Sequence, residues 1–261
     1  MFKGVLLDLD GVVYVDDYLI EGALSTIQWL NAHHYAVRFI TNTSTKTRNQ
    51  LIESLQRLEI PALEEQVFSA VQAAESWLEA QSITRVAPLV SDSVRLSLSE
   101  RFEIDEMSPE VVLIGDIGDL WCYDILNRAF HWLMAGAKLV CIHRNRYWLT
   151  GGEFALDIGA FVAALEYAAG VKAVVIGKPS TEFFHEACRS MVLPPEDVLV
   201  VGDDIEADVG GAQLSGCTGV LVETGKYDAA QVERSSIRPY RQIASIADLP
   251  ELLDSSSSDD S

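Results

Sequence analysis

Eight short apolar runs constrain the fold of this chain more than any other feature. They are rich in Val, Ile and Leu, do not alternate with polar residues, and are bounded by glycine or polar positions. Strands buried on both faces of a parallel sheet have this pattern. Amphipathic helical patterns separate many of the runs, which predicts an α/β fold with a largely parallel sheet. The runs span residues 5–10, 36–41, 85–90, 110–115, 138–142, 173–177, 197–202 and 219–224.

Polar residues follow four of these runs. In open parallel sheets, ligands bind beyond the carboxyl ends of the strands. Taken singly, each cluster has an ordinary explanation as a turn, a helix cap or a solvated loop. Together they are far less common, provided that the four runs are neighbours in one sheet. The residues are Asp8 and Asp10, Thr41 and Asn42, Lys178, and the acids Asp203, Asp204 and Asp208.

The pair Asp8 and Asp10 needs a chemical reason. Alternate side chains of a strand point the same way, so the two carboxylates repel each other if the strand continues to Asp10. A divalent cation or a lysine offsets that repulsion. Asp203 could complete an oxygen-rich site for Mg²⁺, while Lys178 holds an anion and Thr41 receives phosphate oxygens at a helix N-terminus. These groups are what phosphoryl transfer requires.

Charge and composition exclude several classes of function. The chain of 261 residues has a formal net charge of −20, which disfavours nonspecific binding to nucleic acid or to an anionic membrane surface. An anionic substrate then needs positive charge supplied locally or by a metal. The N-terminal run is too short for a signal peptide, and no run reaches the roughly 20 apolar residues of a membrane helix. The four scattered cysteines form no CxxC pair, which favours reduced thiols in a cytoplasmic protein.

At these residues the sequence resembles the haloacid dehalogenase (HAD) superfamily. The four motifs of that superfamily match DLDG, the threonine that ends FIT, the lysine of GKP, and GDDIEAD, in that order and each after an apolar run. Further stretches resemble its NagD-like branch, which carries a large cap: LLDLDGVVY, FITNTSTKTR, LDIGAFVAALEYA and VGDDIEADVGGAQLSGCTGVLVETGKY. The resemblance covers residues 3–253 and implies a Rossmann-like core with an inserted α/β cap domain.

The resemblance also implies roles for single residues. Asp8 would attack phosphorus, and Asp10 would protonate the leaving oxygen and then activate water. Mg²⁺ would be held by Asp8, the backbone carbonyl of Asp10, and Asp203. Dehalogenases have no acid at the position of Asp10, so its presence favours phosphate chemistry. Thr41, Asn42 and Lys178 would bind the phosphoryl group, and Asp204 and Asp208 would lie in the shell around the metal ligands.

In such proteins the cap follows the third core strand, here expected at 85–90. This predicts core segments at 1–90 and 172–253, a cap at 91–171, and a disordered Ser/Asp tail at 254–261. The cap should select the substrate, and His143, Arg144 and Asn145 are the polar candidates there, although a solvated strand end is the better explanation for them. The stretch VVLIGDIGD at 111–119 closely resembles VLVVGDDIEAD, which contains Asp203. The pattern alone cannot decide which of the two stretches binds the metal, and only the resemblance to the superfamily favours Asp203 over Asp116.

The sequence therefore predicts a Mg²⁺-dependent phosphatase that acts on a small phosphorylated molecule. A phosphotransferase of the same fold and a non-catalytic phosphate-binding scaffold are the alternatives. Keeping repelling carboxylates has no purpose in a scaffold, whereas hydrolysis and transfer differ only in the acceptor. Caps of this branch often help to form dimers, so a homodimer stays open. The sequence does not identify the substrate.

Overall fold

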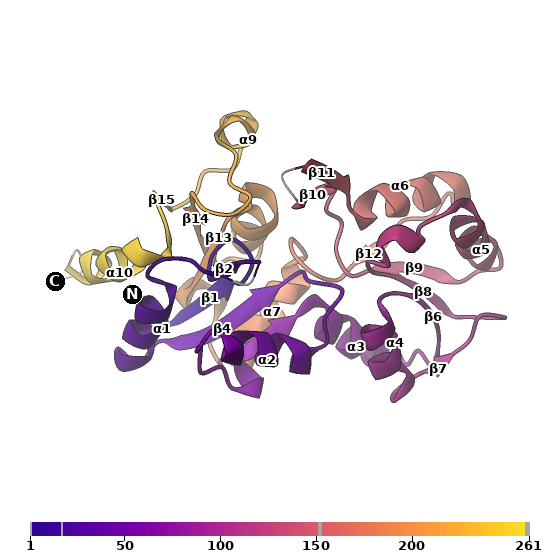
Figure 1. Ribbon diagram of the computed structural model, residues 1–261, viewed down its shortest axis with the longest axis horizontal. Helices are drawn as coiled ribbons and strands as arrows, with labels where there is room; N and C mark the ends of the chain where they lie inside the picture. The colour runs from indigo at the N-terminus through magenta and orange to yellow at the C-terminus, as the bar shows by residue number, and fades with distance from the viewer. Residues whose placement is uncertain (1, 17, 151–152, 259–261) are drawn as a thin grey trace. The chain divides into compact units, whose positions relative to one another are not determined.

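The chain forms two compact units, described here from a computed structural model that covers residues 2–16, 18–150 and 153–258. The core unit comprises residues 1–41, 49–68 and 178–261. The inserted unit comprises residues 42–48 and 69–177, so most of it lies in the chain between two parts of the core unit. Each unit has its own sheet, as the ribbon shows (Figure 1).

The core unit is built on a six-stranded sheet in the order β15-β14-β13-β1-β4-β5. The pairings of β1 with β13 and β4, and of β14 with β13 and β15, are parallel. All five residues of β1 and of β13 are buried, as the non-alternating apolar runs predicted. The strands are β1 (Gly4–Asp8), β4 (Ala36–Thr41), β5 (Val67–Ser69), β13 (Val198–Gly202), β14 (Thr218–Val222) and β15 (Arg241–Ile243).

Several helices of the core unit bury apolar residues in the same cluster as strands of this sheet. In α1 the buried Ala23, Ile27 and Leu30 recur at helical spacing and belong to the same apolar cluster as Val5 and Leu7 of β1. The helices are α1 (Ala23–Ala32), α2 (Arg48–Arg57), α7 (Thr181–Ser190), α8 (Gly211–Leu214), α9 (Ala229–Arg234) and α10 (Leu249–Ser258). Smaller elements are β2 (Tyr14–Val15), β3 (Tyr18–Leu19), the 3-10 turns η1 (Glu64–Gln66), η3 (Pro195–Asp197) and η5 (Ile246–Asp248), and the π-helical η4 (Ile205–Gly210).

The inserted unit has a five-stranded parallel sheet in the order β12-β9-β8-β6-β7. Its strands are β6 (Arg85–Leu89), β7 (Glu103–Ile104), β8 (Val111–Ile114), β9 (Lys138–Cys141) and β12 (Val174–Val175). The remaining elements are α3 (Ala70–Ala80), α4 (Asp92–Ser99), η2 (Gly118–Leu120), α5 (Tyr123–Met134), the antiparallel hairpin β10 (Tyr147–Thr150) and β11 (Glu153–Leu156), and α6 (Ile158–Ala169). The α/β class with two parallel sheets is thus confirmed.

Two strands lie in a different sheet from the one expected. The run at 85–90 forms β6, which pairs with β8 and β7 in the inserted unit and is not the third strand of the core sheet. The run at 173–177 forms the two-residue β12, which pairs with β9. The sixth place in the core sheet is taken by β5, whose three residues give too short an apolar signal to predict. The inserted unit therefore begins near residue 69 and ends at 177, not at 91 and 171.

The C-terminal segment is more ordered than its composition predicted. Leu252 and Leu253 of α10 are buried in the core cluster, and the helix continues through the serines to Ser258. Because adding a residue to an existing helix costs little, a packed first turn explains this extension. Residues 259–261 of the expected tail lie outside the described residues.

Among the described residues, none of the helices has the length and apolar character to cross a membrane.

Candidate active site

Three neighbouring strands of the core sheet end at the same edge and bring their last residues together. Asp8 ends β1 and is in register with Ile40, so Thr41, which ends β4, lies one position further along. Leu7 is in register with Val201, and Asp203 follows directly after β13. Asp8, Thr41 and Asp203 are all buried, at 4%, 1% and 2% exposure. Parallel strands are the reason that residues so distant in sequence meet here.

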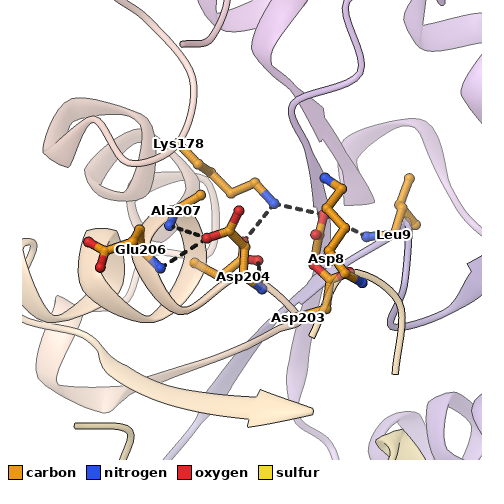
Figure 2. A network of polar contacts seen from close by, with 9 residues as sticks. Asp8, Leu9, Lys178, Asp203, Asp204, Glu206 and Ala207 are labelled. Atoms are coloured by element: carbon orange, nitrogen blue, oxygen red, sulfur yellow. Dashed lines mark hydrogen bonds and ion pairs between the residues drawn. The ribbon is translucent and has the colours of Figure 1, made fainter. Parts of the chain in front are cut away.

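Lys178 joins this edge from the start of the third core segment, residues 178–261. Its Nζ lies 2.8 Å from Oδ1 of Asp8 and 2.6 Å from Oδ1 of Asp208. Figure 2 shows the ammonium group reaching Asp8. Burial lowers the pKa of Lys178, but the carboxylates of Asp208 and Asp8 raise it more, and the net shift is upward. The lysine therefore stays charged and neutralises part of a buried acidic cluster.

Asp8, Asp203 and Asp208 form that cluster, with one oxygen of each within 4.8 Å of the others. Burial is the main cause that raises the pKa of all three acids. The negative charge of a neighbouring carboxylate raises each pKa further. The pKa of Asp208 rises to about 7 in this way. Like charges so close in a buried site call for a cation beyond Lys178.

The oxygen atoms of the cluster differ in how they are used. Among the described residues, Oδ1 of Asp203 is buried and has no hydrogen-bond partner, whereas its Oδ2 accepts the backbone N–H of Lys226 at 2.7 Å. Asp208 uses both oxygens, one for Lys178 and one for the N–H of Asp204. An orphaned, buried carboxylate oxygen close to a second carboxylate fits a hard divalent cation such as Mg²⁺. Asp203 and Asp8 are better placed to hold it than Asp208.

Asp10 and Asp204 occupy the rim of the cluster. The strand β1 ends at Asp8, and Asp10 lies beyond it in an isolated bridge to Tyr14, half-buried. The charge of Asp10 contributes to the raised pKa of Asp8, so the two acids interact although they do not share one strand. The side chain of Asp204 accepts the N–H groups of Glu206 and Ala207 at 2.9 Å each (Figure 2). Asp204 therefore caps η4.

Residues 224–226 also lie at the site, although their sequence alone predicted no role for them. Besides the Lys226 N–H, the hydroxyl of Thr224 donates a hydrogen bond to the carbonyl of Gly11. The segment thus links the loop after β1 to the acid that follows β13. The motif GKY directly after an apolar run was the available signal, because a lysine at a strand end beside an acidic site is a candidate for charge compensation.

Two glycines allow this close approach. Gly11 has φ +87°, and a Cβ on it would lie 2.0 Å from Oδ2 of Asp203. Gly225 has φ +65°, and a Cβ on it would lie 2.1 Å from the same oxygen and 2.4 Å from Cα of Gly11. Only glycine combines this backbone conformation with the space that Asp203 occupies. The DLDG glycine therefore shapes the surroundings of Asp203, an acid that could hold a metal ion.

We expect Gly11→Ala to destabilise the protein by about 2–4 kcal/mol, because it adds a steric clash to the cost of a left-handed alanine. Gly136→Ala is the matched control, since Gly136 has φ +105° and open space around its Cβ position. The control should lose only the backbone cost of about 1 kcal/mol. Urea unfolding of both variants measures the difference, and equal losses would show that Asp203 yields to the new methyl group.

The candidates of the inserted unit make local contacts. Arg144 forms an ion pair with Glu166, which is 7% exposed and also accepts the N–H of Ala173. His143 is buried, with Nε2 3.8 Å from Asp157, and the carbonyl of Asn145 accepts the N–H of Gly159. These contacts lie within the inserted unit, and a role of His143, Arg144 and Asn145 in substrate selection stays a prediction.

Two further residues of the motifs fall in the inserted unit. Asn42 follows β4 and is half-buried, in the segment 42–48. Asp116 follows β8, and its side chain accepts the N–H of Gly118 at 2.8 Å. Asp116 thus closes a local turn after a strand of the smaller sheet, while the similar motif at Asp203 follows a strand of the core sheet.

Comparisons with known proteins agree with these observations. Residues 5–101 match a family model described as haloacid dehalogenase-like hydrolase, and residues 175–249 match one described as HAD-hydrolase-like. The chain is 40% identical to haloacid dehalogenase-like hydrolase domain-containing protein 2 of Bos taurus, over 91% of this chain and 90% of that protein. It is 36% identical to the human phospholysine phosphohistidine inorganic pyrophosphate phosphatase, over 96% and 94%.

The fold has relatives among solved structures as well. NagD from the E. coli K-12 strain superposes with a TM-score of 0.84 at 21% identity, over 94% of this chain and 97% of that one. An α/β core with an inserted α/β unit, and acids and a lysine gathered at the strand ends, define a class of hydrolases. The chain belongs to the haloacid dehalogenase-like hydrolases, with the fold of the NagD-like branch.

Proposed function

We propose that this protein is a Mg²⁺-dependent phosphatase that hydrolyses a small phosphorylated molecule through an aspartyl phosphate on Asp8. The observation that carries the proposal is the buried contact of Asp8 with Lys178 at 2.8 Å, beside the orphaned oxygen of Asp203. A carboxylate that could act as a nucleophile, a buried positive charge and a carboxylate oxygen suited to a metal ion support this reaction. The names of phosphatases among the relatives support the same reaction.

In the first step a carboxylate oxygen of Asp8 attacks phosphorus. Oδ1 of Asp8 is held by Lys178 and by the N–H of Leu9, so we assign the attack to Oδ2. The bond from Asp8 to phosphorus forms while the bond from phosphorus to the leaving oxygen breaks, and Asp10 gives its proton to that oxygen. In the second step Asp10 takes a proton from water, which attacks phosphorus and releases inorganic phosphate and the free Asp8 carboxylate.

The remaining residues bind and orient the phosphoryl group. Lys178 neutralises charge on its oxygens, and Thr41 with the following Asn42 donates hydrogen bonds to them. Asp8, Asp203 and the carbonyl of Asp10 would hold Mg²⁺, which supplies charge neutralisation and in-line positioning when it is bound. Asp208 keeps Lys178 in place through its 2.6 Å contact. Asp204 orients η4, the element that carries Asp208.

The test is phosphate release from p-nitrophenyl phosphate and from a panel of phosphorylated metabolites, with Mg²⁺ and with EDTA. We expect release that EDTA abolishes and added Mg²⁺ restores, since the acidic cluster needs a cation to accept a phosphate dianion. A new phosphate ester in place of free phosphate would make the protein a phosphotransferase. No release and no ester from any compound would favour the scaffold.

The partner that we propose is the small phosphorylated substrate alone. The net charge of −20 argues against nucleic acid and against an anionic membrane surface. The four cysteines are free, in accord with the cytoplasm as the proposed compartment. A homodimer stays a possibility that size-exclusion chromatography with light scattering tests directly.

A further inference from the structure

Lys226 brings a second positive charge to the acidic site. Its N–H donates to Oδ2 of Asp203, so its backbone is fixed against the cluster. Gly225, its neighbour, lies against the same oxygen and against Gly11. A lysine in this position has a side chain long enough to reach the acids of the site.

The charge of Lys226 acts on the site residues. It lowers the pKa of Asp8 and of Asp203, in opposition to the burial that raises both. In the described part of the chain, the Nζ of Lys226 forms no hydrogen bond or ion pair at bonding distance, in contrast to the doubly bound Lys178. The residue is exposed overall, so a ligand can reach it.

A count of charges shows why this lysine matters. The carboxylates of the cluster carry three negative charges when all are ionised, and Lys178 offsets one of them. A divalent cation offsets the other two and leaves the cluster neutral. The charge of Asp10 at the rim also acts on Asp8. A further cation therefore offsets negative charge that Lys178 and the metal ion leave uncompensated, and this favours the binding of a dianion to a protein whose net charge is −20.

We infer that Lys226 is a phosphate-binding residue, which together with Lys178 holds the doubly charged phosphate group of the substrate. This inference rests on the proposed function, because it assumes that the site accepts a phosphate. The two lysines then have different tasks. Lys178 is fixed between Asp8 and Asp208, whereas the ammonium of Lys226 is available to the incoming oxygens.

The test compares Lys226→Met and Lys226→Arg with the wild type. Methionine keeps the length and the backbone N–H to Asp203 and removes only the charge. Lys172→Met is the control, because Lys172 is an exposed lysine of the inserted unit and its loss changes the net charge equally. Isothermal titration calorimetry measures the binding of inorganic phosphate in the presence of Mg²⁺ and, separately, the binding of Mg²⁺ alone.

We expect Lys226→Met to weaken phosphate binding by about tenfold or more, and Lys226→Arg to keep most of it. The affinity for Mg²⁺ should rise or stay the same in Lys226→Met, because an ammonium beside Asp203 repels the metal ion. The different responses of the two affinities are decisive, because a merely structural role for Lys226 would lower the affinities for phosphate and for Mg²⁺ together. Lys172→Met should match the wild type in both titrations.

Three results would overturn the inference. If the wild type binds phosphate and hydrolyses phosphate esters, and Lys226→Met binds phosphate with unchanged affinity, the inference is refuted and the proposed function remains intact. A joint loss of phosphate and Mg²⁺ binding assigns Lys226 to structure. A wild type that neither binds phosphate nor releases it from any ester removes the proposed function and this inference with it.

Discussion

Replacing Asp8 by Asn should abolish phosphate release while the protein stays folded. We expect kcat to fall by about 10⁴-fold or more, because an amide oxygen is a poor nucleophile and no neighbouring group can replace it. The fold should persist, since Lys178 keeps its contact with Asp208. The melting temperature should stay equal or rise, because one of three repelling buried carboxylates is lost. Phosphate release with p-nitrophenyl phosphate and thermal unfolding measure the two effects.

Asp116→Asn is the matched control for this variant. Asp116 follows a strand within a closely similar stretch of sequence, but it closes a turn in the inserted unit. Its substitution should change kcat less than about twofold, since it lies in the sheet that carries none of the proposed catalytic groups. Retained activity in Asp8→Asn would show that Asp8 is not the nucleophile. A large loss of activity in Asp116→Asn would show that the stretch around Asp116 takes part in catalysis.

Lys178→Met should reduce both activity and stability. The substitution leaves Asp8 and Asp208 buried at 4% and 1% exposure without their shared cation. Breaking a buried ion pair in this way costs about 3–5 kcal/mol of unfolding free energy. Protonation of Asp208, whose pKa is about 7 even beside Lys178, reduces the loss at neutral pH and below. Urea unfolding above pH 8 measures the full cost, and saturating Mg²⁺ should recover part of it by binding to the same acids.

Two further variants separate this effect from an ordinary loss of charge. In the double variant Lys178→Met/Asp208→Asn one of the stranded charges is gone, so stability should lie above that of Lys178→Met alone. Lys3→Met removes a lysine whose ion pair with Asp197 is 65% exposed on the lysine side, and it should cost about 0–1 kcal/mol. If Lys178→Met is no less stable than Lys3→Met, the buried contacts of Lys178 do not stabilise the fold.

The sequence predicted the elements better than their assignment to sheets. All eight apolar runs form strands, because uninterrupted Val, Ile and Leu suit a strand that is covered on both faces. The same pattern occurs in two separate parallel sheets, so it cannot distinguish between them. Only pairing partners decide that β6 and β12 belong to the inserted unit, and pairing leaves no mark in local composition.

The candidate site shows the same division. Asp8, Lys178, Asp203 and Asp208 were predicted together, and the structure brings them into one buried cluster. Their meeting was foreseeable because strand ends of a parallel sheet converge. Lys178 was expected to follow a strand of the core sheet, but the preceding strand β12 belongs to the sheet of the inserted unit. Lys226 was missed because a single lysine after a strand has too many ordinary explanations.

The shared use of Lys178 has a consequence for how this protein can change over generations. The lysine and the acids around it are both the proposed reactive groups and buried charges that must balance for the chain to fold. A lineage that lost catalysis by replacing Lys178 first would pass through an unstable form. Loss of Asp8 carries no such barrier. An inactive descendant should therefore retain the lysine with its remaining acid as a relic of chemistry that it no longer performs.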